Sequence, residues 1–119
     1  MILEVIGEKF RIALSEKNPK TALEVKEALP IVSKAMRWGD EIYFKTPVSA
    51  ELENPQEIVE VGDFAYWPPG NALCIFFGKT PVSDEHIRPA SPVNVIGRVE
   101  GELTKLRKVK DGDTISILP

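Results

Sequence analysis

Residues 62–78 read GDFAYWPPGNALCIFFG, and this stretch decides the fold. A Gly-Asp turn leads into the apolar segment 64–67, the turn 68–70 follows, and the apolar run 72–77 comes next. A run of this length without alternation is typical of a strand buried on both faces. The stretch therefore predicts two neighbouring strands in the middle of a mainly β protein. It leaves the register of the second strand open, because a slip of one residue exchanges Cys74 for its neighbours.

The N-terminal side of this stretch predicts two hairpins with one helix between them. Alternating apolar residues in 10–14 follow a turn at Gly7-Glu8, which indicates a hairpin over residues 1–14. A helix of about three turns is expected to begin at Pro19, to have its free amides capped by Asn18, and to end near Leu29 ahead of Pro30. Residues 31–37 and 41–45 flank Gly39-Asp40 and form the second hairpin.

The C-terminal side predicts a long loop, two strands and a second short helix. Residues 47–55 are a polar loop and 58–61 a short strand or its approach, whereas 79–92 hold three prolines and form the longest irregular connection. A strand follows at 93–99, then apolar residues at spacing three on a helix over 103–109. A last strand points Ile115 and Ile117 inward. The pattern is a mainly β barrel or sheet of six or more strands with two short helices.

Composition excludes several classes of protein. The 119 residues carry 15 basic and 18 acidic side chains, so the net charge is −3 and no basic excess favours nucleic acid. A chain with 43% apolar residues is expected to form one domain over residues 1–119. The longest apolar run has six residues, whereas a membrane helix needs about 20, and no secretory signal is evident. A cytoplasmic protein without membrane association is expected, and the single cysteine, Cys74, is expected to be a buried apolar residue.

Several segments, in chain order, resemble cyclophilins. Residues 10–14 followed by the PKTA of 19–22 are similar to the second strand and first helix of that family, and the GDF of 62–64 resembles its lead into a barrel strand. The VIGRV of 95–99 with the following helix resembles the late strand and the helix behind it. The WG of 38–39, residues 62–78 and the PAS of 89–91 look more closely like a small prokaryotic cyclophilin-like family without an assigned function. The resemblance implies a closed β-barrel of about eight strands whose ends are capped by helices.

The resemblance does not carry the isomerase residues with it. Glu60 stands where cyclophilins have glutamine, and Val93 stands where they have histidine. Arg37 is the nearest candidate, by order, for the arginine that polarises the proline amide in that family. Prolyl isomerisation needs a donor to the twisted amide nitrogen, so whether this protein is an enzyme is left open.

Other chemistry has weak support in the sequence. His86, the only histidine, follows Asp84-Glu85 in the 79–92 loop and is most simply a solvated loop residue. The glutamates between 51 and 60 lack the alternating ligand spacing of a calcium loop, and no glycine-rich phosphate loop is present. We therefore expect no metal and no cofactor.

Aromatic density is the remaining functional signal. Eight of the nine aromatic residues fall within residues 38–77, where they either fill the barrel or line a groove for a small molecule or short peptide. Binding in such a groove, formed by aromatic residues and the 79–92 loop, is the favoured interpretation. An enzyme acting on amide bonds and a regulatory subunit that binds another protein are the alternatives. The candidate ligand-binding residues are Arg37, Tyr43, Glu60, Tyr66, Trp67, Phe76 and His86.

Overall fold

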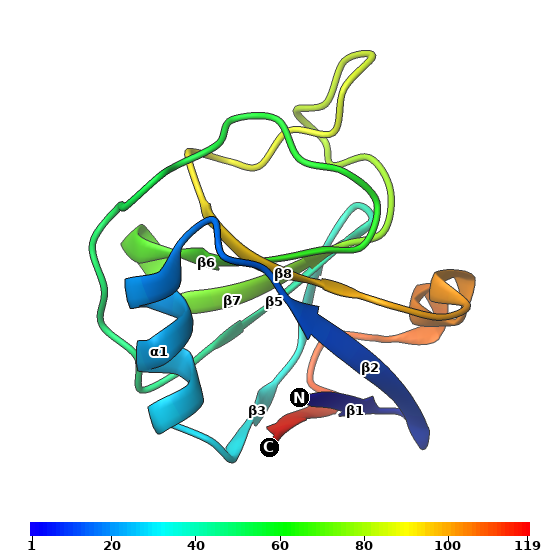
Figure 1. Ribbon diagram of the computed structural model, residues 1–119. Helices are drawn as coiled ribbons and strands as arrows, with labels where there is room; N and C mark the ends of the chain where they lie inside the picture. Colours follow the sequence, from blue (N-terminus) through cyan, green and yellow to red (C-terminus); the bar gives the residue numbers. More distant parts are fainter.

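The computed structural model describes residues 1–119 and shows an antiparallel β-barrel with three short helices (Figure 1). The strands are β1 (Ile2–Val5), β2 (Glu8–Leu14), β3 (Ile31–Lys34), β4 (Met36–Trp38), β5 (Glu41–Lys45), β6 (Asp63–Trp67), β7 (Ala72–Phe76), β8 (Asn94–Val99) and β9 (Thr114–Leu118). The helices are α1 (Pro19–Glu27) and the 3-10 helices η1 (Pro68–Gly70) and η2 (Leu103–Lys108). The predicted mainly β barrel is confirmed, with nine strands where about eight were expected.

The order of the strands explains how the barrel closes. The sheet runs β3-β9-β1-β2-β8-β6-β7-β5-β4, so its two edge strands are β3 and β4. These edges are consecutive in the chain and are separated only by Ala35, whose N–H donates to the Asp113 carbonyl at 2.8 Å. The chain itself therefore joins the two edges, which leaves little unpaired edge exposed. Residues 31–37, expected to be one strand of a hairpin, are thus divided between two ends of the sheet.

The barrel interior holds the main apolar core. Side chains from every strand except β4 meet there, among them Leu3, Ile42 and Leu73, which are fully buried. Val25 of α1 and Leu106 of η2 pack into this core from outside the sheet. Figure 1 shows the two helices on opposite sides of the molecule. The expectation that helices cap the barrel is confirmed. The 103–109 segment is a 3-10 helix ending at Lys108.

The N-terminus of α1 corrects one detail of the prediction. Asn18 makes no side-chain cap, because its buried side chain donates to the Val95 carbonyl (2.7 Å) and accepts from the Asn54 N–H (2.6 Å). The carboxylate of Glu53 accepts from the amides of Lys20 (3.2 Å) and Thr21 (3.0 Å) instead. The loop before β6 therefore supplies the cap, and α1 is fixed to that loop.

A second, smaller apolar cluster lies outside the barrel wall. Strand β7 is buried on both faces, as expected, and its register places Leu73 and Ile75 inside and Cys74 and Phe76 outside. The outer residues pack with Ala65 and Val95 of the neighbouring strands, and with Val59 and Val93 from the two long loops that precede β6 and β8. Two isolated bridges, Gln56 to Val93 and Val59 to Ile87, join these loops to each other. Residues 58–61 therefore do not form a regular strand.

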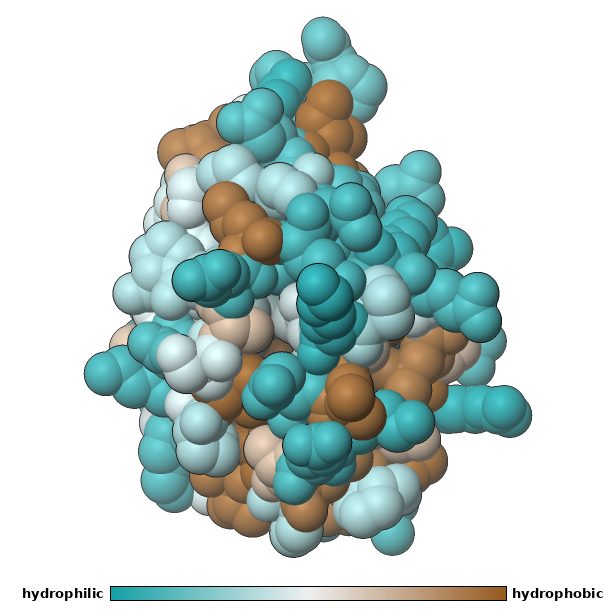
Figure 2. Space-filling model, turned by 60° about the vertical axis from the view of Figure 1, so that its left-hand side comes forward, coloured by the Kyte–Doolittle hydropathy of each residue, from teal (hydrophilic) through white to brown (hydrophobic).

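The surface has no large apolar area on the face turned forward in Figure 2. Hydrophilic side chains cover most of that face, and the apolar side chains between them are more numerous in its lower half. Separate exposed apolar residues of this kind are normal for globular proteins. No helix has the length and apolar character needed to cross a membrane.

Candidate functional site

A pocket of about 170 Å³ lies on the outer face of the barrel, beside the second apolar cluster. Strands β4 to β7 supply its floor, and the segment before β8 supplies its rim. Its lining residues are Trp38, Glu41, Tyr43, Trp67, Cys74, Pro89, Ala90 and Val93. We call Trp38, Tyr43 and Trp67 the aromatic wall. The site is thus an apolar hollow that contains one carboxylate.

The two-residue period of the strands brings these side chains together. Trp38 of β4 pairs with Glu41 of β5, so both side chains face the same side of the sheet. Tyr43 lies two residues farther along β5 and pairs with Cys74 of β7, which puts it on that side as well. Trp67 reaches the pocket from the end of β6. The lining therefore follows from strand pairing, with no special backbone conformation.

Trp67 is held on two sides. Its indole N–H donates to Ser91 Oγ at 2.6 Å, which ties the ring to the segment that forms the pocket rim. Its ring also packs on Gly70, where an added Cβ would come within 2.7 Å of a ring carbon. The turn at 68–70 therefore needs glycine at its last position so that the indole can fold back over it.

Glu41 is the one charged residue of the pocket. Its side chain lies among apolar groups with 5% of the residue exposed, and its Oε1 has no hydrogen-bond partner. Burial raises the pKa of this carboxyl from 4.5 to about 7, and a bond from the Cys74 thiol opposes that rise only in part. The group therefore changes charge near neutral pH, which is typical of residues in functional sites.

Cys74 lines the same pocket as a protonated thiol. Burial, and after it the negative charge of Glu41, raises the pKa of Cys74 well above its ordinary value of 9.0. A thiol is a nucleophile only as the thiolate. The chemistry of this pocket therefore does not include nucleophilic attack by its cysteine at neutral pH.

Two of the seven residues expected to bind a ligand, Tyr43 and Trp67, line this pocket. Tyr66 lies inside the barrel, where its hydroxyl donates to the Val48 carbonyl at 2.7 Å and accepts from the Ala50 N–H. Phe76 is fully buried in the second apolar cluster. Alternation along β6 turns Tyr66 away from the pocket, whereas Phe76 shares the outer face of β7 with Cys74 but is packed within the second apolar cluster and does not line the pocket.

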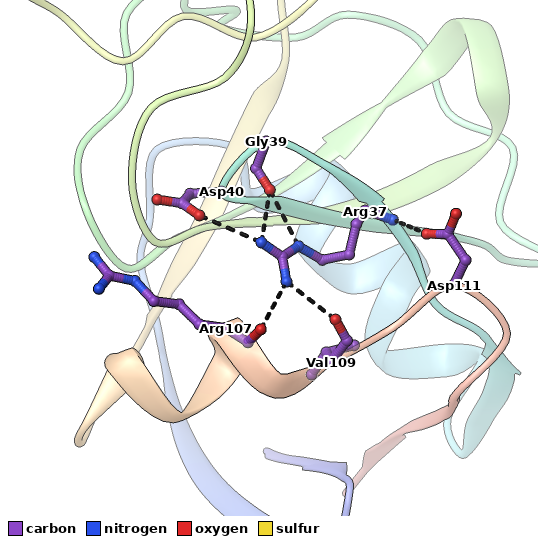
Figure 3. A network of polar contacts seen from close by, with 6 residues as sticks. All are labelled: Arg37, Gly39, Asp40, Arg107, Val109 and Asp111. Carbon is purple, nitrogen blue, oxygen red and sulfur yellow. Dashed lines mark hydrogen bonds and ion pairs between the residues drawn. The ribbon is translucent and has the colours of Figure 1, made fainter.

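Arg37 is bound into a polar network on the other side of its strand (Figure 3). Its guanidinium donates to the carbonyls of Gly39 (2.9 and 3.1 Å), Arg107 (3.0 Å) and Val109 (3.0 Å), and it pairs with Asp40 (3.3 Å). It also lies 5.0 Å from the centre of the Phe77 ring. These contacts fix the β4–β5 turn to η2. Because Trp38 follows it directly, Arg37 faces away from the pocket.

Glu60 and His86 lie elsewhere on the surface. The exposed carboxylate of Glu60 accepts from Arg98 at 2.9 Å. His86 is exposed in the loop that projects beyond the barrel in Figure 1, where its backbone N–H donates to Asp84. The structure brings neither side chain to the lining of the pocket.

Sequence reasoning did not name Glu41 or Trp38 as a candidate, and it placed the 79–92 loop at the groove without singling out any rim residue. Glu41 and Tyr43 are two positions apart on a predicted strand, so alternation alone could have placed them on one face. The rim residues Pro89 and Ala90 gave no such signal, because their approach depends on the path of a long loop.

These observations define a β-barrel protein with a small aromatic pocket on its outer wall. The chain belongs to the Cyclophilin-like family, whose model matches residues 1–118. A similar solved structure is the solution structure of a hypothetical protein from Archaeoglobus fulgidus. It is 47% identical, with a TM-score of 0.83, and the match covers 98% of this chain and 91% of that one. No curated protein matches the sequence.

Proposed function

We propose that this protein is a binding module that holds a small molecule, or one side chain of a short peptide, in the pocket on its outer wall. The observation that carries the proposal is the combination of an aromatic wall with a buried carboxylate whose Oε1 has no partner. Ligand sites are usually apolar hollows with a few polar groups that orient the ligand. This pocket has that composition.

The rigidity of the pocket supports the same proposal. Trp67 is fixed by Ser91 and by the turn at Gly70, and Cys74 and Val93 are buried in the second apolar cluster. A preformed site loses little conformational entropy when a ligand enters. The volume of about 170 Å³ suits a group about as large as a benzene ring or a branched alkyl group.

The enzyme alternative has less support from the same residues. Val93, at the position where cyclophilins have histidine, contributes an aliphatic side chain to the pocket. The Arg37 guanidinium is committed to carbonyl groups on the other face of β4. A prolyl isomerase needs a donor to the amide nitrogen, and neither residue supplies one at this pocket.

The test uses the two tryptophans of the chain, since both line the pocket. Tryptophan emission is followed while small neutral and charged fragments, among them cyclohexanol, phenol and trimethylammonium, are added to the purified protein. We expect saturable changes for at least one fragment. An Ala90→Leu variant, which adds a side chain at the rim, should abolish them, whereas Ala90→Ser should keep them. Flat titrations with the wild-type protein, or equal responses in the two variants, would refute the proposal.

A further inference from the structure

We propose that the ligand of this pocket carries an organic ammonium group, which donates an N–H to the Glu41 carboxylate and packs its alkyl substituents against the aromatic wall. This inference rests on the proposed function, because it names the chemical class that the same pocket selects. Three features of the pocket support it: an unpartnered acceptor, an uncompensated charge and three aromatic residues in the lining.

The unpartnered acceptor is Oε1 of Glu41. The residue is 5% exposed, and this oxygen contacts neither solvent nor a protein donor. Buried polar atoms in native proteins nearly always have a hydrogen-bond partner, and leaving one without a partner is unfavourable. Because other atoms of the Glu41 side chain line the pocket, a small rotation of the carboxylate would present it to a bound molecule, whose N–H group would supply the missing donor.

The charge of Glu41 is also uncompensated. None of the ion pairs in the protein includes this residue, and no lysine, arginine or histidine lines the pocket. The other titratable groups of the lining are the Cys74 thiol on β7 and the Tyr43 phenol on β5, and neither can carry a positive charge. A ligand cation would therefore be the only positive partner of this carboxylate.

The aromatic wall favours the same class of ligand. The π faces of tryptophan and tyrosine attract ammonium groups, and tryptophan attracts them most strongly. Two tryptophans and one tyrosine share this pocket with a carboxylate, and its remaining lining is aliphatic apart from the Cys74 thiol. Alkyl substituents on the nitrogen would also bury apolar surface against these rings.

Other ligand classes fit these residues less well. An anion would face the Glu41 carboxylate without a basic side chain to balance it. A metal ion would find one carboxylate, and no group of three His, Cys, Asp or Glu side chains that could hold a metal occurs in the chain. Above about pH 7, where Glu41 is ionised, a neutral molecule would leave the buried charge without a partner of opposite sign.

The test compares three probes of similar shape: trimethylammonium, which has one N–H; tetramethylammonium, which has none; and neutral tert-butanol. Tryptophan emission and the two indole N–H signals in a ¹⁵N correlation spectrum are followed at pH 8 and constant ionic strength. We expect trimethylammonium to bind about tenfold more tightly than tert-butanol and more tightly than tetramethylammonium. Glu41→Gln should weaken trimethylammonium binding by about tenfold and leave tert-butanol binding within about twofold. Glu16→Gln, at an exposed glutamate that is not part of the pocket lining, is the matched control and should change neither.

The outcomes separate this inference from the proposed function. If tert-butanol binds as tightly as trimethylammonium, or if Glu41→Gln leaves both affinities unchanged, the ammonium class is wrong although the pocket still binds ligands. If tetramethylammonium matches trimethylammonium, the N–H contact to Glu41 is refuted. If none of the probes moves the indole signals at high millimolar concentration, both the inference and this test of the proposed function fail.

Discussion

Replacing Glu41 by glutamine should remove a pH-dependent loss of stability. The carboxyl has a pKa of 4.5 when exposed and about 7 in the folded protein, so the folded state binds the proton more tightly than the unfolded state does. Stability therefore falls as pH rises from about 4.5 through about 7, and the full loss is present above that range. At 1.36 kcal/mol for each pH unit, the loss due to this residue is at most about 3 kcal/mol.

The assay is urea unfolding followed by tryptophan emission at several values between pH 4 and pH 8. A buried glutamine amide has a cost of its own, but that cost does not depend on pH. The quantity to measure is therefore the change in the stability difference between Glu41→Gln and the wild type, not the difference at one pH. We expect the variant to gain about 2 to 3 kcal/mol on the wild type between the two ends of the range.

The control for this experiment is Glu16→Gln, whose stability should follow the wild-type curve in parallel at every pH. Parallel curves for Glu41→Gln as well would show that the Glu41 carboxylate is solvated or already paired. That result would remove the unpartnered buried charge on which the ligand inference depends.

Three further predictions concern the scaffold around the pocket. Arg37→Ala removes the contacts between the β4–β5 turn and η2, so it should lower the free energy of unfolding by about 2 kcal/mol in urea titrations. Its control is Arg11→Ala, at a well-exposed ion pair, which should leave the urea midpoint unchanged. Gly97→Ala would bring a Cβ within 2.6 Å of the Ala13 carbonyl oxygen and should cost about 2 kcal/mol, and an unchanged midpoint would contradict the close packing of β2 on β8. At Glu53, burial favours the neutral form, but hydrogen bonds from the first turn of α1 outweigh it and lower the pKa below 4.5. The wild type should therefore lose stability as the pH falls from about 4.5 through that lower value, and Glu53→Gln should lack this loss in acid titrations followed by circular dichroism.

Several parts of the fold could be read from local patterns. The apolar run 72–77 predicted a strand buried on both faces, and β7 has that burial because one face lies in the barrel and the other under loops. The helix after Pro19 and the hairpin around Gly7 followed from rules that involve only neighbouring residues. These predictions succeeded because the forces involved act over a few positions of the chain.

The candidate site was less accessible to the same reasoning. Tyr43 and Trp67 line the pocket, but strand alternation turns the equally aromatic Tyr66 into the barrel. Phe76 lies on the outer face with Cys74, and the packing of the second apolar cluster keeps it out of the pocket lining. The N-terminal cap of α1 shows the same limit. Asn18 has the right side chain at the right position, yet distant Val95 and Asn54 occupy its polar atoms.

The sequence by itself determined that this chain forms a mainly β protein with short helices and a doubly buried strand, since periodicity and turn residues act locally. Only the tertiary structure decided that Glu41 is an unpartnered carboxylate in an aromatic pocket. Its pKa and its missing donor depend on Trp38 and Cys74 of neighbouring strands and on a loop almost fifty residues farther along the chain. Burial and the presence of a partner belong to the folded assembly of these segments, and no local pattern of residues encodes them.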